Sequence, residues 1–265
     1  MLLVIDVGNT NTVLGVYQGA ELRGHWRLST VRAQTADEYG ILIRNLLALD
    51  GMAASAVKHM MVASVVPPLN ALIEEMAAKY FHVSPVFLEP GTRTGMAIHY
   101  DSPQDVGADR IANSVAAYEK LGGPCIVVDF GTAVTFDVVS ANGEYLGGVI
   151  APGLGVSAEA LFQRAARLPR VELREPESVI GSNTVGSMQS GLFYGAVGLV
   201  DGILDRILAT VGKDGKDAKL VATGGQAKLV AGASKYKLPV DGLLTLEGLR
   251  IIYERSRATS RRKLG

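Results

Sequence analysis

An internal repeat constrains the fold of this chain more than any other feature of its sequence. Residues 3–16 align without a gap over residues 126–139. Each copy consists of an apolar run, an Asp-x-Gly turn and a second run rich in β-branched residues, which is the pattern of a β-hairpin. The alignment pairs Asp6 with Asp129, Gly8 with Gly131 and Thr12 with Thr135. A repeated unit of this kind predicts two similar halves.

The boundary between the two predicted halves lies near Gly122-Gly123-Pro124. We therefore expect an N-terminal half at residues 1–122 and a C-terminal half at residues 123–265. Each copy of the repeat also ends in a second turn, which is Gln18-Gly19 in the first copy and Asn142-Gly143 in the second.

Short runs of Val, Ile and Leu alternate along the chain with stretches of helical periodicity. Glycines cluster behind the apolar runs, which is typical of strands that end in tight turns where a ligand can lie close to the backbone. The expected strands are 2–5, 61–66, 126–128 and 219–222, and the expected helices are 37–49, 69–80, 106–121 and 189–211. Alternating strands and helices predict an α/β fold.

The composition is that of a globular protein with no excess charge. Apolar residues make up 48% of the 265 residues, and 26 basic side chains balance 26 acidic ones. This composition excludes a disordered chain. It also lacks the positive charge expected of a protein whose main partner is nucleic acid or an anionic membrane. The single cysteine, Cys125, cannot form an intramolecular disulfide, and its apolar surroundings indicate a buried, unreactive thiol.

The start of the chain and its apolar stretches bear on its location. The sequence begins Met1-Leu-Val-Ile-Asp, with no basic start and no small-residue cleavage site, so we expect no signal peptide. The longest apolar stretch, residues 191–200, ends at Asp201 and is shorter than the ~20 residues that a membrane-spanning helix needs. We expect a cytoplasmic protein.

The first hairpin turn, Asp6-Val-Gly-Asn-Thr-Asn-Thr12, has the composition of a phosphate-binding loop. It combines a glycine, successive backbone N–H groups and short polar side chains, which together can hold phosphate oxygens. Asp6, at the end of a predicted strand, would face a bound Mg²⁺, because hard cations prefer carboxylate and water oxygens. An ordinary hairpin with Asx hydrogen bonds also explains a single copy. The second copy favours a nucleotide whose phosphate chain lies between two such turns.

Other nucleotide-binding patterns fit less well. Gly212-Lys213 and Gly215-Lys216 are each followed by Asp where the Walker motif requires Ser or Thr, which excludes a P-loop kinase. Residues 153–158 match the dinucleotide fingerprint in its Gly/Ala form, but Pro152 interrupts the approach from the strand. A helix with Ser157 as its N-cap explains these glycines more simply.

A polar segment, residues 99–110, precedes the apolar face of a predicted helix. The helix dipole favours an acid such as Asp109 in the first turn, whereas Arg110 in the same turn is mildly unfavourable. Binding a ligand carboxylate with the guanidinium fork would explain Arg110. A purely structural role for both residues remains equally open at this point.

Some further features carry weaker signals. Residues 181–186 precede a helix and could present Thr184 to a ligand, and residues 223–225 follow the last predicted strand and could pack against a base or sugar. The helix from Gln189 carries small residues that permit close packing, within the chain or across a dimer. These are Gly191, Gly195, Gly198 and Gly202. The histidines show no metal-ligand spacing, so we expect no zinc site.

Four motifs, in this order along the chain, resemble those of the type III pantothenate kinases. They are Asp6-Val-Gly-Asn-Thr-Asn-Thr12, Gly107-Ala-Asp-Arg110, Val128-Asp-Phe-Gly-Thr-Ala133 and Gly147-Gly-Val-Ile-Ala-Pro-Gly153. The likeness runs from Met1 to about Tyr253. This family belongs to the superfamily of acetate kinase, sugar kinases, heat-shock protein 70 and actin. The resemblance implies two duplicated ribonuclease-H-like halves with an ATP cleft between them.

The resemblance further implies ATP-dependent phosphorylation of pantothenate to 4′-phosphopantothenate, the first step of coenzyme A biosynthesis. The enzyme would be a homodimer that uses Mg²⁺ and a monovalent cation, K⁺ or NH₄⁺. The resemblance also implies which residues bind each ligand. ATP would contact Asp6, Val7, Gly8, Asn9, Thr10, Asn11, Thr12, Val13 and Thr132. Pantothenate would contact Tyr100, Gly107, Ala108, Asp109, Arg110 and Thr184, with Asp109 as the catalytic base, and Asp129 would hold the monovalent cation. The chemistry of phosphoryl transfer agrees, because a carboxylate is the usual acceptor of the hydroxyl proton.

Two alternatives remain. Another enzyme of the superfamily, such as a sugar kinase or an exopolyphosphatase, would share the Asp-x-Gly turns but does not need Gly107-Ala-Asp-Arg110. A non-catalytic accessory factor in transcription could use the same scaffold. The zero net charge and the presence of Asp109 argue against that role, and we expect neither a nucleic-acid nor a membrane partner.

Overall fold

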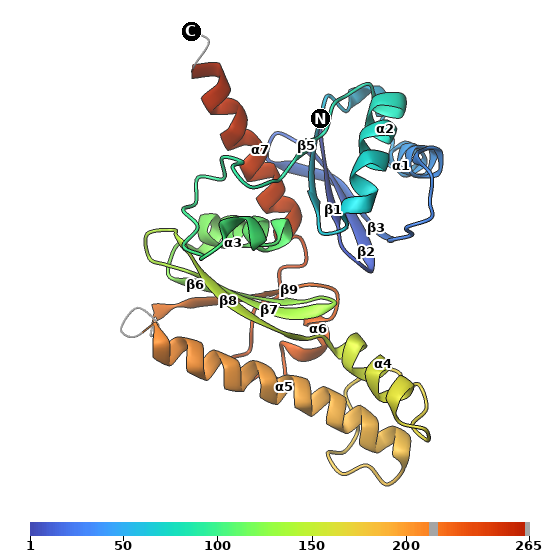
Figure 1. Cartoon of the computed structure of the whole chain (residues 1–265), viewed down its shortest axis with the longest axis vertical. Helices are drawn as coiled ribbons and strands as arrows, with labels where there is room; N and C mark the ends of the chain where they lie inside the picture. Colours follow the sequence, from blue (N-terminus) through green and yellow to red (C-terminus); the bar gives the residue numbers. More distant parts are fainter. Residues whose placement is uncertain (212–216, 263–265) are drawn as a thin grey trace. The chain divides into compact units, whose positions relative to one another are not determined.

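The computed structural model describes residues 1–211 and 217–262 (Figure 1). Its contacts divide the chain into two compact units. The first unit contains residues 1–96 and 100–116 and the segment that begins at Leu244, and the second contains residues 97–99 and 117–243. Each unit is built around its own β-sheet.

The first unit contains a five-stranded sheet in the order β3-β2-β1-β4-β5. The strands are β1 Leu2–Val7, β2 Asn11–Gln18, β3 Glu21–Ser29, β4 His59–Ser64 and β5 Val86–Phe87. β1, β2 and β3 form an antiparallel meander, whereas β4 and β5 extend the sheet in parallel with β1. Because β1 and β4 are parallel, their carboxyl ends lie at the same edge of the sheet, where Val7 pairs with Ser64.

Helices pack on both faces of this sheet. They are α1 Ala36–Leu49, α2 Asn70–Phe81 and α7 Leu244–Arg262. α1 and α2 pack against each other and share one apolar core with the strands, in which Ile5 and Ile43 are buried. α7 contacts β1, β2 and β4, and its Leu246 lies against Gly15 of the sheet, which Val4 also adjoins. Val4 and Ile5 are consecutive strand residues and therefore face opposite sides.

α1 shows why the local sequence forms a helix at this place. Thr35 and Glu38 form a capping box: the Glu38 amide donates to Thr35 Oγ1 at 3.2 Å, and the Thr35 amide donates to Glu38 Oε2 at 2.7 Å. These bonds satisfy backbone N–H groups that a helix start leaves without an intrahelical partner. Tyr39, Ile43 and Leu47 follow at intervals of one turn and are buried, so the helix presents an apolar stripe to the sheet.

The second unit contains a four-stranded sheet in the order β8-β7-β6-β9. The strands are β6 Cys125–Phe130, β7 Ala133–Val139, β8 Tyr145–Pro152 and β9 Lys219–Thr223, and the helices are α4 Leu154–Arg164, α5 Thr184–Thr210 and α6 Ala227–Val230. β6, β7 and β8 form an antiparallel meander and β9 pairs in parallel with β6. This arrangement repeats that of β1, β2, β3 and β4. Phe136, Val200 and Leu204 are buried in its core.

The remaining elements are one helix that both units share and several short turns of helix. α3 (Ala108–Leu121) begins in the first unit and ends in the second. The short 3-10 helices among the described residues are η1 Ala54–Ala56, η2 Pro67–Leu69 and η3 Pro103–Asp105.

The structure confirms the predicted α/β class and each predicted strand and helix overlaps an observed one. Both hairpins of the repeat are present, as β1–β2 and β6–β7. The second turns are also present, and Gly19 and Gly143 adopt positive φ angles of 61° and 79° there. Glycine occupies this conformation with little steric cost, which explains its place in both turns.

The two hairpins differ in turn length by one residue, so the gapless pairing of Thr12 with Thr135 is wrong. Asp6 pairs with Val13 in the first hairpin, whereas Asp129 pairs with Thr135 in the second. Directly opposite residues of antiparallel strands point to the same face. Thr135 therefore shares a face with Asp129, but Thr12 lies on the opposite face of the sheet from Asp6.

The two units differ from the predicted halves, residues 1–122 and 123–265, at the C-terminus. The segment from Leu244 belongs to the unit built on β1, although it follows the whole second sheet in sequence. The reason is packing, since α7 contacts three strands of the first sheet. The position at which the duplicated sequences join stays a prediction.

The start of α4 corrects one local expectation. Gly153, and not Ser157, is the N-cap of this helix. The Ser157 amide donates to the Gly153 carbonyl at 2.9 Å, so Ser157 lies inside the first turn.

Two expectations remain, one on the Gly-Lys pairs and one on membrane-spanning helices. The Gly212-Lys213 and Gly215-Lys216 pairs, compared above with the Walker motif, lie outside the described residues. Within the described parts of the chain, no helix has both the length and the apolar character needed to cross a membrane.

Candidate active site

The β1–β2 turn in the first unit is a tight loop with small polar side chains. The Gly8 amide donates to the Asn11 carbonyl at 3.0 Å and closes the turn. Thr30, just after β3, braces it from outside: Thr30 Oγ1 donates to the Gly8 carbonyl at 2.7 Å, and the Thr30 amide donates to the Thr10 carbonyl at 2.9 Å. The backbone of the turn is therefore fixed by its neighbour strand before any ligand binds.

Residues of this turn differ in solvent exposure. Asn9 and Thr10 are exposed, and Asp6 is partly buried at the carboxyl end of β1. Arg32 Nη2 donates to Asn9 Oδ1 at 3.3 Å, which places a guanidinium beside the turn. Exposed backbone, small side chains and a nearby positive charge are the properties of an anion-binding loop.

Thr12 does not present its hydroxyl to solvent. Its side chain is 0% exposed, and Oγ1 lies 2.9 Å from Thr30 Oγ1 and 3.5 Å from the Tyr39 hydroxyl. This burial follows from the register, which turns Thr12 toward α1 while Asp6 points to the other face. Thr12 therefore stabilises the conformation of the loop from its buried side.

The start of α3 holds Asp109 and Arg110 in the first unit. Asp109 Oδ1 accepts a hydrogen bond from the Arg110 amide at 2.8 Å. Burial raises the pKa of the Asp109 carboxyl, although the Arg110 amide and guanidinium act in the opposite direction. Gly107 leaves room for this carboxylate, because a Cβ at residue 107 would lie 2.5 Å from Asp109 Oδ1 and would displace it. A carboxyl group with a raised pKa and a fixed orientation is suited to accept a proton.

α7 holds the first turns of α3 in place. A Cβ at Gly248 would overlap with the Ala112 carbonyl, so the two helix backbones are in direct contact. Thr245 Oγ1 donates to Asn113 Oδ1 at 2.7 Å in the same region. α7 therefore positions Asp109 by packing against the helix that carries it.

The other predicted substrate residues of the first unit vary in burial. Arg110 is only 7% exposed, whereas Tyr100 is 38% exposed. Ala108 is the first residue of α3 and Gly107 immediately precedes it. The predicted set from Gly107 to Arg110 is thus one continuous helix start.

The β6–β7 turn in the second unit is tighter than its counterpart. The Gly131 amide donates to the Ala133 carbonyl at 3.0 Å, and the exposed Thr132 lies at the tip. Gly153, the N-cap of α4, approaches this turn so closely that a Cβ there would lie 2.5 Å from the Gly131 and Thr132 carbonyls. The Gly153 amide donates to the Thr132 carbonyl at 3.1 Å. The start of α4 therefore supports the turn.

Asp129 lies at the carboxyl end of β6 with glycine backbone around it. Thr223, the last residue of β9, is its parallel neighbour, and Gly224 follows with a φ of +93°. A Cβ at Gly224 would overlap with Asp129 Oδ1, and a Cβ at Gly131 would lie 3.7 Å from that same oxygen. The predicted turn at residues 223–225 thus lies against Asp129, which sequence reasoning did not foresee.

Gln226 is a further residue at this place that sequence reasoning missed. Its amide donates to the Phe130 carbonyl at 3.2 Å, and its side-chain Nε2 lies near Gly155 of α4. Gln226 Oε1 is buried and has no hydrogen-bond partner among the described residues. A buried acceptor of this kind is costly unless a ligand or water supplies a donor.

Thr184 is the first residue of α5 and is exposed. Asn183 caps the helix, accepting a hydrogen bond from the Gly186 amide at 2.8 Å. The N-terminus of a helix carries partial positive charge and favours anionic or acceptor groups. Thr184 belongs to the second unit, whereas Tyr100 and Asp109 belong to the first.

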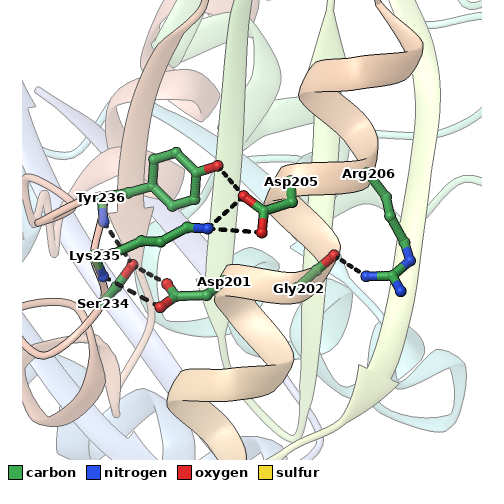
Figure 2. Close-up of polar contacts among 7 residues, drawn as sticks. All are labelled: Asp201, Gly202, Asp205, Arg206, Ser234, Lys235 and Tyr236. Carbon is green, nitrogen blue, oxygen red and sulfur yellow. Dashed lines mark hydrogen bonds and ion pairs between the residues drawn. The ribbon is translucent and has the colours of Figure 1, made fainter.

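A polar cluster fixes the segment after α6 to the middle of α5 (Figure 2). Two acids one turn apart on α5 supply the acceptors. Ser234 Oγ donates to Asp201 Oδ1 at 2.6 Å, Lys235 Nζ donates to Asp205 Oδ2 at 2.7 Å, and the Tyr236 hydroxyl donates to Asp205 Oδ1 at 2.5 Å. The cluster anchors the segment that follows the turn at residues 223–225 and so restricts the movement of that turn.

The carboxylates of the two hairpins set the kind of cation that fits. No group of three or more His, Cys, Asp or Glu side chains able to hold a metal occurs in residues 1–211 and 217–262. Asp6 in the first unit and Asp129 in the second are each the last but one residue of a strand. Taken separately, each carboxylate suits a hard cation whose other ligands are phosphate, water or backbone oxygens.

Comparison with known proteins gives a consistent assignment. A family model described as type III pantothenate kinase matches residues 2–206. The type III pantothenate kinase of Koribacter versatilis is 56% identical over 273 residues, covering 99% of this chain and 98% of that protein. The one from Myxococcus xanthus is 57% identical over 259 residues, covering 98% of this chain and 100% of that protein.

Solved structures with low identity share the fold. A putative Baf family transcriptional activator from Campylobacter jejuni has a TM-score of 0.61 at 22% identity, covering 97% of this chain and 99% of that one. A putative N-acetylglucosamine kinase from Porphyromonas gingivalis has a TM-score of 0.50 at 16% identity, covering 97% of this chain and 100% of that one. These likenesses show the fold alone. The near full-length relatives and the matching family model show that this chain belongs to the type III pantothenate kinase family.

Proposed function

We propose that this chain transfers the γ-phosphoryl group of ATP to the primary hydroxyl of pantothenate, which yields 4′-phosphopantothenate and ADP in the first step of coenzyme A biosynthesis. The observation that carries this proposal is the start of α3. There a partly buried carboxyl group with a raised pKa, Asp109, lies beside a buried guanidinium, Arg110. Pantothenate has a hydroxyl to be deprotonated and a carboxylate to be bound, so the two side chains match its two polar ends.

Asp109 would act as the general base. In phosphoryl transfer the protein chiefly positions the groups and neutralises charge, and one group accepts the proton of the attacking hydroxyl. The hydrogen bond from the Arg110 amide to Asp109 Oδ1 orients the carboxylate. Arg110 would bind the pantothenate carboxylate, and Tyr100 and Thr184 would complete the contacts with this substrate.

The two hairpin turns would hold the phosphates of ATP. The β1–β2 turn, from Asp6 to Val13, supplies backbone N–H groups and short side chains, and Thr132 supplies a hydroxyl at the tip of the β6–β7 turn. Mg²⁺, when bound with ATP, neutralises charge on the phosphates, and Asp6 is the residue that would face it. Asp129, with glycine backbone around its carboxylate, would hold K⁺ or NH₄⁺.

We also propose a cytoplasmic homodimer that acts on these two small molecules. The zero net charge supports the absence of a nucleic-acid or membrane partner. A non-catalytic role on the same scaffold is not favoured, because the base and the guanidinium expected of the kinase are both present at the start of α3.

The experiment is a coupled assay of ADP release. Pantothenate should support turnover in the presence of ATP, Mg²⁺ and K⁺, whereas a panel of sugars and a reaction without acceptor should not. Asp105→Asn, an exposed acid just before α3, is the matched control for Asp109→Asn. Turnover with a sugar but not with pantothenate would overturn the substrate assignment.

A further inference from the structure

A network of hydrogen-bonded hydroxyl and carboxylate groups lies on β7 and β8, next to the end of β6, and is formed by the half-buried Thr135 and the buried Asp137 and Tyr145. The Tyr145 hydroxyl donates to Asp137 Oδ1 at 2.9 Å, and Thr135 Oγ1 donates to Asp137 Oδ2 at 3.2 Å. Asp137 and Tyr145 are both 0% exposed. The Asp137 carboxylate therefore accepts one hydroxyl hydrogen on each of its two oxygens, inside the protein.

This hydrogen-bonded network does not belong to the apolar core of the second unit. That core takes the alternate residues of the same strands, Val134, Phe136 and Val138 on β7. Thr135 and Asp137 point to the other face, because successive strand residues alternate. Burying a carboxylate is costly even when it is hydrogen-bonded. Two hydroxyl donors, Thr135 and Tyr145, hold this carboxylate on the face opposite the apolar core.

Asp129 shares this face and lies directly opposite Thr135. The two residues are register partners of antiparallel strands, so their Cβ atoms are about 4.5–5.5 Å apart on the same side of the sheet. A hydroxyl has one hydrogen and two lone pairs. Because the hydrogen of Thr135 Oγ1 is directed to Asp137, this oxygen can offer other groups only lone pairs.

We propose that Thr135 Oγ1 is a second side-chain oxygen for the monovalent cation at Asp129, and that Asp137 and Tyr145 are the positioning residues that direct it. The inference rests on the proposed function, which places that cation at Asp129. A carboxylate and a hydroxyl oxygen at this separation can both contact one hard cation, which prefers oxygen ligands. The other half of the protein lacks this arrangement, because the residue opposite Asp6 is Val13.

Tyr145 is itself held firmly, as a positioning residue must be. Its amide donates to the Ala97 carbonyl at 2.8 Å, and its carbonyl accepts from the His99 amide at 2.8 Å. The backbone of residue 145 is thus fixed on both sides by the segment 97–99, within the second unit. The Tyr145 hydroxyl therefore reaches Asp137 from a fixed point.

The first test measures cation binding without turnover. The thermal unfolding midpoint is recorded against KCl concentration, with NaCl added to keep the ionic strength constant, since a cation that binds the folded state raises the midpoint. Thr135→Val removes the oxygen at nearly constant volume and should raise the K⁺ concentration needed for half of the stabilisation by about tenfold, the size of a typical charged hydrogen-bond loss. Thr135→Ser retains the oxygen and should stay within about twofold of wild type.

The second test separates positioning from general packing. Tyr145→Phe removes one hydroxyl and should raise the required K⁺ concentration several-fold, while the Michaelis constants for ATP at saturating K⁺ stay unchanged. Asp137→Asn is the second positioning variant and should shift the K⁺ requirement in the same direction. Thr210→Val is the matched control, because Thr210 Oγ1 donates to the Arg206 carbonyl within α5, at 2.7 Å.

The outcomes separate this inference from the proposed function. Stabilisation of wild type by K⁺ but no turnover with pantothenate would contradict the substrate assignment alone, and a weaker K⁺ response in Thr135→Val would still support the cation ligand. Equal K⁺ responses in wild type and Thr135→Val would overturn the inference even if pantothenate is phosphorylated. A loss in Thr135→Ser equal to that in Thr135→Val would likewise overturn it, because the oxygen is still present.

Discussion

Gly224 lies so close to Asp129 that a Cβ atom at residue 224 would overlap with Oδ1 of the carboxylate. The two residues are far apart in sequence and meet because β9 pairs in parallel with β6, which places Thr223 beside Asp129. The φ of Gly224 is +93°, a conformation that side-chain-bearing residues rarely adopt. The backbone of one turn therefore forms part of the surroundings of an acid on another strand.

Gly224→Ala should impair both stability and the response to K⁺. The new methyl group must displace Asp129 or distort the turn, so we expect a loss of ~1–3 kcal/mol in unfolding free energy. We also expect a higher K⁺ concentration for half-maximal activity. Denaturant unfolding and K⁺ titrations of turnover measure the two effects. Gly232→Ala is the control, because a Cβ at residue 232 meets no atom within 4 Å, and an equal loss there would show that the effect is not local.

Asp109→Asn should abolish most turnover while pantothenate still binds. The amide keeps the size of the side chain but cannot accept the proton, and general-base contributions are typically ~10²–10⁴-fold in rate. Steady-state kinetics and calorimetric titration with pantothenate measure rate and binding separately. A folded variant with turnover within a few-fold of wild type would show that Asp109 is only a helix-start acid.

Arg110→Gln should change binding more than rate. The guanidinium would contact the pantothenate carboxylate in the ground state and in the transition state alike, so its removal raises the Michaelis constant with less effect on the maximal rate. Glutamine retains much of the length of this buried side chain, which limits the loss of packing. A large fall in maximal rate at an unchanged Michaelis constant would assign Arg110 to the transition state instead.

The pH dependence should follow the raised pKa of Asp109, which burial causes. Only the ionised carboxylate accepts a proton, so kcat/KM should fall on the acidic side at a pH above the ordinary 3.8 of an aspartate. The stability of the protein should change in the opposite direction with pH. The folded state binds the proton of Asp109 more tightly than the unfolded state, so its unfolding free energy decreases as the pH rises through the raised pKa. Asp109→Asn should therefore be more stable than wild type at neutral pH and lose that advantage in acid, which melting curves at both pH values check.

The two threonines of the ATP turns should respond differently. Thr12→Val removes a buried hydroxyl that lies 2.9 Å from Thr30 Oγ1, so we expect a loss of ~0.5–1.5 kcal/mol in stability together with weaker ATP binding. Thr132→Ala alters an exposed side chain and should weaken ATP binding with little change in stability. Michaelis constants for both substrates decide the matter, and a selective loss of pantothenate binding in either variant would show that the phosphate chain is placed wrongly.

The sequence by itself predicted the two hairpins and several of the strands and helices, but not β3, β5, β8 or α7. The strands and helices depend on local periodicity and on turn residues such as Gly19 and Gly143, whose backbone conformations are a property of the few residues around them. The repeated Asp-x-Gly hairpin and the polar start of α3 were likewise visible, because each is contained in one short segment. The family motifs lie in these same segments.

The register and the long-range contacts were decided only by the tertiary structure. A turn shorter by one residue moves Thr135, and not Phe136, opposite Asp129, and a one-residue shift reverses the face of every side chain on a strand. The alignment could not show this shift, because apolar and β-branched residues fit either register. For the same reason the burial of Thr12 became apparent only once β2 was paired.

The contacts that surround Asp129 and Asp109 also come from segments distant in sequence. Gly224 reaches Asp129 through the pairing of β9 with β6, and α7 reaches the start of α3 although more than 120 residues separate the two helices in sequence. Strand order and helix packing depend on how the whole apolar surface is buried, which no short segment specifies. The sequence thus determined the chemical groups of the candidate site, and the tertiary structure decided which of them lie next to one another and which residues hold them there.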